Sequence, residues 1–208
     1  MGKANWTLAA TLCVTMLLTL PVSDSAFADP LETFQPNPQD LYDLDHYSYY
    51  KWGFTVDGYS PAAPITSAQI ILKDIYDWQA EPNQLYIHLL DWAPTGVTVF
   101  SDQDGGSDTL AGQGILLKTY VNLPTTPQTL VYDLTTPQLA TLNQYLANGG
   151  NMGIGFDPDC HFYNNGITFQ LSYPPSYLLS QVPEPGTVAL VGTGLLGGIG
   201  VLYRRRMK

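Results

Sequence analysis

The sequence predicts a mainly β protein: an antiparallel β-sandwich, jelly-roll-like, with one short helix, an N-terminal signal peptide and a C-terminal transmembrane helix. Three observations support this prediction. About eight short runs rich in Ile, Val, Leu, Tyr, Phe and Thr alternate with Pro, Gly and Asn turns. One stretch of leucines has helical spacing. Each end of the chain carries a largely apolar segment beside basic residues.

Residues 1–28 have the order of parts of a secretory signal peptide. Lys3 supplies the positive start, and a largely apolar run follows at 6–20. A small-x-small pattern, which signal peptidase accepts, ends at Ala28. We therefore expect signal peptidase to remove this segment, so that the mature chain begins near Asp29. The alternative is a first buried helix of the fold.

The body, residues 29–181, is dominated by strand-like runs. These runs are 52–59, 65–78, 84–92, 97–100, 115–123, 129–134, 152–156 and 167–173. In the last of them apolar and polar residues alternate, which is typical of a strand with one solvated face. Three prolines at residues 28–44 indicate an extended arm before the first strand.

One helix is predicted between the strands. Thr136 can cap its start, and Pro137 suits the first helical turn. Leu139, Leu142 and Leu146 fall on one face, and Gly149 ends the pattern. A helix of about three turns is long enough to close one end of a sandwich.

Residues 186–203 contain no charged side chain and are just long enough to span a bilayer as a helix. Arg204, Arg205 and Arg206 follow at once, which keeps this end in the cytoplasm and the body outside. The tetrapeptide Val182-Pro183-Glu184-Pro185 precedes the span, and its two prolines keep it out of any helix.

The order of these parts in residues 182–208 resembles the PEP-CTERM sorting signal, which occurs on exported proteins of Gram-negative bacteria that make exopolysaccharide. The resemblance implies recognition and removal of the tail by an exosortase-type membrane transpeptidase. The implied sorting-motif residues are Val182, Pro183, Glu184, Pro185, Arg204, Arg205 and Arg206. The span would then be a transient inner-membrane anchor, and the body would end at the cell surface or outside the cell. The alternative is a plain anchor that is never processed.

The formal net charge is −10, but the basic residues gather at the ends of the chain. Between residues 29 and 181, three lysines stand against sixteen acidic residues, so the body carries −13. Binding to nucleic acid requires Lys and Arg for phosphate neutralisation, so this balance excludes a nucleic-acid partner. Cations and neutral sugars remain as partners for an acidic surface.

Asp102, Asp104 and Asp108 have the Asp-x-Asp-Gly spacing of a calcium loop, in which alternate carboxylates converge on one cation. Gln113 stands at the twelfth position, where an EF-hand has a bidentate Glu. The ligand set is therefore incomplete, which favours the alternative of a polar hairpin loop with solvated acids. Calcium is the one cofactor that the sequence suggests.

Asp157, Asp159 and His161 form the second polar cluster. On an extended turn these three side chains could share one side, as a metal or ligand site requires. The alternative is a turn in which Asp157 precedes a proline and Asp159 binds nearby amides. Cys160 is the only cysteine after signal removal, so it has no intramolecular disulfide partner and is expected to be a buried thiol.

No nucleophile elbow, phosphate loop or metalloprotease helix occurs in the chain, so we expect no catalytic residue. Trp and Tyr side chains are plentiful in the body, and exposed rings near carboxylates would suit sugar binding. The first hypothesis is an exported, non-catalytic surface or matrix protein that binds exopolysaccharide. The alternatives are a surface glycan hydrolase using Asp157 and Asp159, and a calcium-stabilised adhesive module.

Overall fold

The computed structural model describes residues 31–102, 106–149 and 151–174. These residues form two five-stranded sheets in which every strand pairing is antiparallel. The first sheet has the order β1 (Leu31–Phe34), β10 (Ile167–Ser172), β3 (Ser67–Asp77) and β7 (Gln128–Asp133), and β9 (Phe162–Tyr163) also pairs with β3. The second has the order β5 (Gly96–Ser101), β2 (Ser48–Phe54), β8 (Met152–Pro158), β4 (Gln84–Leu90) and β6 (Ile115–Val121).

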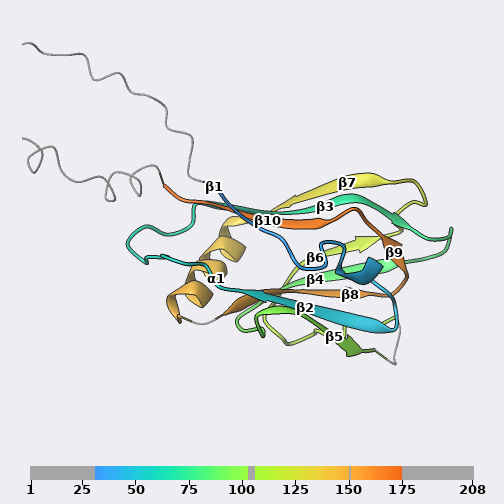
Figure 1. Ribbon diagram of the computed structural model, residues 1–208, viewed down its shortest axis with the longest axis horizontal. Coiled ribbons are helices and arrows are strands. Elements are labelled where there is room, and N and C mark those ends of the chain that lie inside the picture. The colour runs from blue at the N-terminus through green and yellow to red at the C-terminus, as the bar shows by residue number, and fades with distance from the viewer. Residues whose placement is uncertain (1–30, 103–105, 150, 175–208) are drawn as a thin grey trace, which may run out of the picture.

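The two sheets lie as two layers, with α1 (Thr136–Ala147) at one end (Figure 1). For the described residues, a mainly β fold of antiparallel sheets with one α-helix is therefore confirmed. A short 3₁₀ helix, η1 (Leu41–Asp43), joins β1 to β2. The end of the molecule opposite α1 carries β9 and the loop that follows η1 (Figure 1). This opposite end holds the polar and aromatic groups described below.

Aromatic and aliphatic side chains from both sheets form one core. Phe34 of β1 stacks on Phe54 of β2, with ring centroids 4.6 Å apart. Phe54 also meets Phe169 of β10, at 5.6 Å between centroids. Both pairs join the first sheet to the second, because Phe54 belongs to the second sheet and its two partners to the first. Burial of such rings is a large favourable contribution to folding.

The structure differs from the sequence prediction at the beginning of the body. Residues 31–34 form β1, whereas the prolines indicated an extended arm at residues 28–44. β1 is an edge strand that pairs only with β10, a position in which flanking prolines are tolerated. The next strand runs from Ser48 to Phe54, whereas the sequence pattern placed it at 52–59. The chain leaves the sheet before Gly58, whose φ is +74°.

The helix runs from Thr136 to Ala147, and its N-cap is Thr135 where we expected Thr136. The backbone N–H of Thr135 donates to Oε1 of Gln138 at 2.8 Å, which is one half of a capping box. Leu142 and Leu146 are buried, and Leu139 packs partly buried against the core. The predicted apolar face is therefore the face that contacts the sheets.

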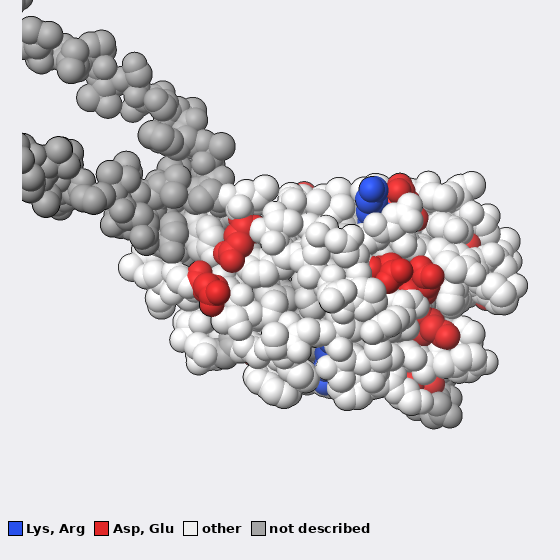
Figure 2. Space-filling model, in the orientation of Figure 1, with Lys and Arg blue, Asp and Glu red and all other residues white. Residues whose placement is uncertain are grey.

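Within the part of the chain that the structure describes, no helix is both long and apolar enough to cross a membrane. The predicted signal peptide at 1–28 and the predicted span at 186–203 lie outside the described residues. On the face shown in Figure 2, acidic side chains form several separate patches and basic ones are few. This distribution agrees with the strongly acidic composition of the body.

Candidate functional site

A pocket of about 240 Å³ opens at the end of the molecule where β9 pairs with β3. Three segments far apart in the sequence form its walls. Its lining residues are Asp45, His46 and Tyr47 before β2, Trp78 directly after β3, and His161 and Tyr163 at β9. The pocket therefore combines aromatic rings, imidazoles and one carboxylate on a single concave surface.

Strand register brings two of these walls together. Tyr163 pairs with Tyr76, and Phe162 pairs with Asp77, so β9 adds a short ribbon to the end of β3. The pairing continues one residue further, because the Trp78 backbone N–H donates to the His161 carbonyl at 3.1 Å. Trp78 and His161 consequently lie opposite one another at the pocket.

The aromatic rings of the pocket are open to solvent. Trp78 is 50% exposed, and Tyr47 and Tyr163 are also exposed. The His161 ring meets Tyr163 edge-on at 4.8 Å between centroids and Trp78 at 6.3 Å. A large apolar ring left in water at a concave surface is a feature of ligand-binding sites more often than of ordinary surface.

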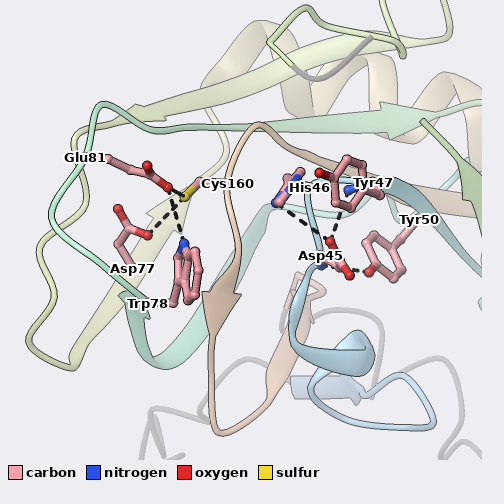
Figure 3. Close-up of polar contacts among 8 residues, drawn as sticks. All are labelled: Asp45, His46, Tyr47, Tyr50, Asp77, Trp78, Glu81 and Cys160. Atoms are coloured by element: carbon pink, nitrogen blue, oxygen red, sulfur yellow. Dashed lines mark hydrogen bonds and ion pairs between the residues drawn. The ribbon is translucent and has the colours of Figure 1, made fainter. Parts of the chain in front are cut away.

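The third wall is a turn that its own hydrogen bonds fix. Oδ1 of Asp45 accepts from the Tyr47 backbone N–H at 3.1 Å, and the Asp45 N–H donates to the Tyr50 hydroxyl at 2.8 Å. Burial raises the pKa of Tyr50, so its hydroxyl stays neutral at physiological pH. The Nδ1 atom of His46 lies 3.8 Å from Oδ1 of Asp45. Figure 3 shows this group beside the cluster described next.

A thiol–carboxylate cluster lies at the adjoining loop. Sγ of Cys160 lies 3.1 Å from Oδ1 of Asp77 and 2.9 Å from Oε1 of Glu81 (Figure 3). Cys160 and Asp77 are buried and Glu81 is exposed. Burial and the two neighbouring carboxylates raise the pKa of the Cys160 thiol, which therefore carries its proton at neutral pH.

A second acidic group lies along β8 and the loop between β5 and β6. Oδ2 of Asp157 accepts from the Thr109 backbone N–H at 2.6 Å, and the Asp159 carboxylate accepts from the Gly106 backbone N–H. Leu110 packs on the same strand beside Gly155, where a Cβ would lie 2.6 Å from its Cδ1 atom. Gly155 thus permits the close approach that holds the loop on β8.

Burial raises the pKa of Asp157 to about 7, the Thr109 hydrogen bond opposes this effect, and the charges of Asp102, Asp159 and Asp108 add to it. The pKa of Asp159 is raised by burial as well. The four carboxylates of Asp102, Asp108, Asp157 and Asp159 are therefore close enough to repel one another electrostatically. His88 is buried, and its Nε2 lies 2.9 and 3.0 Å from the two carboxylate oxygens of Asp108.

The structure groups the predicted site residues differently from the two clusters that their spacing in the sequence indicated. Asp102 and Asp108 come together with Asp157 and Asp159, although we had assigned them to separate sites. His161 lies apart from Asp157 and Asp159, in the aromatic pocket. Asp104 and the sorting-motif residues lie outside the described part of the chain. Asp102 is buried, which differs from a loop of solvated acids.

Sequence reasoning missed Asp45, Asp77, Glu81 and Tyr163 as members of these sites. Asp77 carried one usable signal, because an acidic residue within the apolar run 65–78 requires a partner or a function. The others had no such signal, since each lies in a turn or a very short strand.

Comparison with solved structures gives a weak likeness. A structure titled "Latent aurone synthase (polyphenol oxidase) from natural source" matches with 11% identity and a TM-score of 0.39. The match covers 67% of this chain and 27% of that one. No curated protein matches the chain.

Comparison with protein families gives a match at the C-terminus. Residues 181–206 match the family described as the PEP-CTERM protein-sorting motif. The matched segment includes the Pro-Glu-Pro tripeptide, the uncharged stretch and the arginine cluster from which the sequence resemblance was drawn. The chain is therefore an exported protein that carries the PEP-CTERM sorting motif and is targeted to an exosortase-type sorting system.

Proposed function

We propose that this protein is a non-catalytic surface or extracellular-matrix protein whose body binds a neutral sugar unit of exopolysaccharide. The observation that supports the proposal is the pocket in which Trp78, Tyr47 and Tyr163 face a shared space with Asp45 and two histidines. Export and sorting by the C-terminal motif would place the body where such polymers occur.

The chemistry of the pocket suits a sugar ring. The C–H face of a pyranose is apolar and packs on an aromatic ring, whereas its hydroxyls need donors and acceptors at the edge. Trp78 and Tyr163 offer ring faces, and the Asp45 carboxylate and the imidazole nitrogens offer hydrogen-bonding atoms. A neutral sugar is favoured over an acidic one because the body carries a net charge of −13.

The strand order supports a jelly-roll-like arrangement of the body. In chain order the strands β1, β2, β3, β4, β6, β7, β8 and β10 alternate between the sheets except at β4 and β6, which are neighbours in the second sheet. β5 is added beside β2, and β9 at the end of β3. Such alternation is expected when two Greek keys form a double-sheet jelly roll. The architecture alone does not specify a ligand, so the proposal rests on the pocket.

We favour binding over hydrolysis because of the environment of Asp157. This carboxyl is fully buried, and one of its oxygens is held by the Thr109 amide. A glycosidase pair must flank the bond that it cleaves, with both carboxyls open to the substrate. A buried and amide-bound Asp157 is poorly placed for that reaction.

The first test is retention on exopolysaccharide of the producing organism. We expect Trp78→Ala to weaken binding of the full-length protein at least about tenfold, or about 1.4 kcal/mol, because the largest ring of the pocket is lost. Trp92→Ala is the matched control, since Trp92 is 63% exposed and does not line the pocket. Equal retention of both variants, or no retention of the parent protein, would contradict the proposal.

Calcium binding at the four aspartates is a second candidate function, favoured by one specific observation. Asp157 is fully buried, yet among the described residues nothing donates a hydrogen bond to its Oδ1 atom. Oδ1 of Asp159 likewise accepts no hydrogen bond there. Buried charges are normally paired or coordinate a cation, and carboxylate oxygens are the ligands that Ca²⁺ prefers.

If calcium binds there, a concentration about 100 times the Kd is expected to stabilise the folded protein by about 2.7 kcal/mol. For a chain of this size the melting temperature would rise by about 5–10 °C. Asp157→Asn removes the effect, and Asp133→Asn, at an exposed acid on β7, leaves it intact. Calorimetric scans with calcium and with a chelator measure this, and identical melting temperatures would exclude the calcium site.

A further inference from the structure

We propose that Asp77, Glu81 and Cys160 bind a divalent transition metal ion, with Zn²⁺ the preferred ion, directly behind the aromatic pocket. The site is separate from the four aspartates and does not depend on sugar binding. Its three residues come from the end of β3, the β3–β4 loop and the turn between β8 and β9. The donor atoms Oδ1, Oε1 and Sγ all lie within 4.8 Å of one another.

The count of protons at this cluster points to a cation. Two carboxylate oxygens contact Sγ, at 3.1 and 2.9 Å, but a thiol has only one proton to donate. With both carboxylates ionised, one of the two contacts therefore joins a sulfur and an oxygen with no hydrogen between them. A metal ion in place of that proton would bind the sulfur and both carboxylate oxygens favourably.

Among the described residues, the buried Asp77 carboxylate forms no ion pair with a cationic side chain. Asp77 is 1% exposed, and a second carboxylate, Glu81, shares its thiol neighbour. Among the described residues, no Lys or Arg forms an ion pair with either carboxylate. A buried carboxylate without a cation is costly, and metal coordination is one of the two usual solutions.

Neighbouring amides orient both carboxylates toward the sulfur. Asn83 Nδ2 donates to Oδ2 of Asp77 at 2.6 Å, and Gln79 Nε2 donates to Oε2 of Glu81 at 2.7 Å. The other oxygen of each carboxylate is the one that faces Cys160 (Figure 3). Oε1 of Glu81 also accepts from the Trp78 indole N–H at 3.2 Å, so this oxygen is oriented as well. Hydrogen bonds that orient carboxylates in this way are typical around metal ligands.

Asn83 is itself held in place. Its Nδ2 donates to the Leu123 carbonyl at 3.0 Å, and its Oδ1 accepts from the Leu123 backbone N–H at 2.7 Å. The support for Asp77 thus belongs to the rigid part of the fold. Glu81 is exposed and has freedom to adjust to an ion.

The donor set selects the class of metal. Ca²⁺ and Mg²⁺ take oxygen ligands, whereas a thiolate with two carboxylates suits a borderline ion such as Zn²⁺. With Zn–S of about 2.3 Å and Zn–O of about 2.1 Å, tetrahedral donors lie about 3.6 Å apart. Entry of the ion therefore requires both S···O contacts to widen by roughly half an ångström, and movement of Glu81 can supply much of it.

Binding must deprotonate the thiol. The Cys160 S–H bond breaks, an S–metal bond forms, and one proton leaves to solvent for each ion bound. No oxidant or reductant takes part. Asp77 and Cys160 immediately precede Trp78 and His161, so the bound ion would also tie together two walls of the pocket.

Titration with Co²⁺, a spectroscopic substitute for Zn²⁺, tests the proposal on reduced full-length protein without a polyhistidine tag or polysaccharide. We expect one ion per chain, a thiolate-to-cobalt charge-transfer band in the near ultraviolet, and loss of the band when Zn²⁺ is added. Cys160→Ser is expected to abolish the band. Glu81→Gln is expected to weaken affinity at least tenfold, and Asp57→Asn, at an exposed acid, is expected to leave affinity unchanged.

Absence of the charge-transfer band in the folded parent protein would overturn the proposal. So would equal Co²⁺ affinity of the parent and Cys160→Ser, which would indicate adventitious binding by histidines. Glu81→Gln tests the site with a variant that is expected to fold normally, because Glu81 is exposed and lies in a loop. The result of this titration does not test the sugar-binding proposal, because the solution contains no polysaccharide.

Discussion

The Phe169→Ala variant is expected to lose about 3–5 kcal/mol of its free energy of unfolding. Phe169 is fully buried in β10, lies opposite Phe34 on the neighbouring strand and meets Phe54 from the second sheet. Removal of its ring therefore leaves a cavity at the place where the two sheets contact one another. Surrounding strands that are paired on both sides cannot collapse into that space without breaking their register.

Urea denaturation of the full-length protein measures this loss. Val131→Ala on β7 is the control, because Val131 is 53% exposed and its truncation leaves no cavity. We expect the control to stay within about 0.5 kcal/mol of the parent protein. A loss below 1 kcal/mol for Phe169→Ala would contradict a core that is shared by the two sheets.

The free energy of unfolding is also expected to fall as pH rises from 4 to 8 in a solution that contains a chelator. Burial raises the pKa of Asp157 to about 7 in the folded protein, against about 3.9 in an unfolded chain. Between these two values the folded state holds a proton that the unfolded state has lost, so folding becomes less favourable with rising pH. Three pH units at 1.36 kcal/mol each give about 4 kcal/mol as the full range.

Asp157→Asn isolates this contribution, because the amide has the shape of the neutral acid and does not titrate. We expect its unfolding free energy to vary with pH by much less than that of the parent protein between pH 4 and pH 8. Asp159, whose pKa is also raised, accounts for part of the remaining dependence. Parallel pH profiles of the two proteins would show that Asp157 is ionised normally in the folded state.

The sequence predicted most strands because each one has a local signal. The run 167–173 alternates apolar and polar residues, and the structure has β10 at Ile167–Ser172. The helix was predicted for the same reason, from leucine spacing and Pro137. β1 was missed because prolines flank it, and its stability comes from pairing with β10, which lies about 135 residues later in the sequence.

The candidate sites could be predicted only in part, because they depend on strand register. Nothing local to Trp78 or His161 shows that the backbones of these two residues are hydrogen-bonded. Likewise, the loop that carries Asp102 and Asp108 contacts β8 at two places. The Thr109 N–H donates to Asp157, and Leu110 packs beside Gly155. Residue types that carry chemistry were recognisable, but their grouping was a property of the folded chain.

The most direct measurement of the central claim is an NMR titration of the full-length protein with a neutral oligosaccharide from the producing organism's exopolysaccharide. The account predicts progressive shifts of the Trp78 indole N–H and of the His46 and His161 ring signals, because these groups line the proposed binding pocket. The Trp92 indole signal is expected to stay in place. Shifts confined to signals remote from the pocket, or no shifts at saturating sugar, would contradict the account.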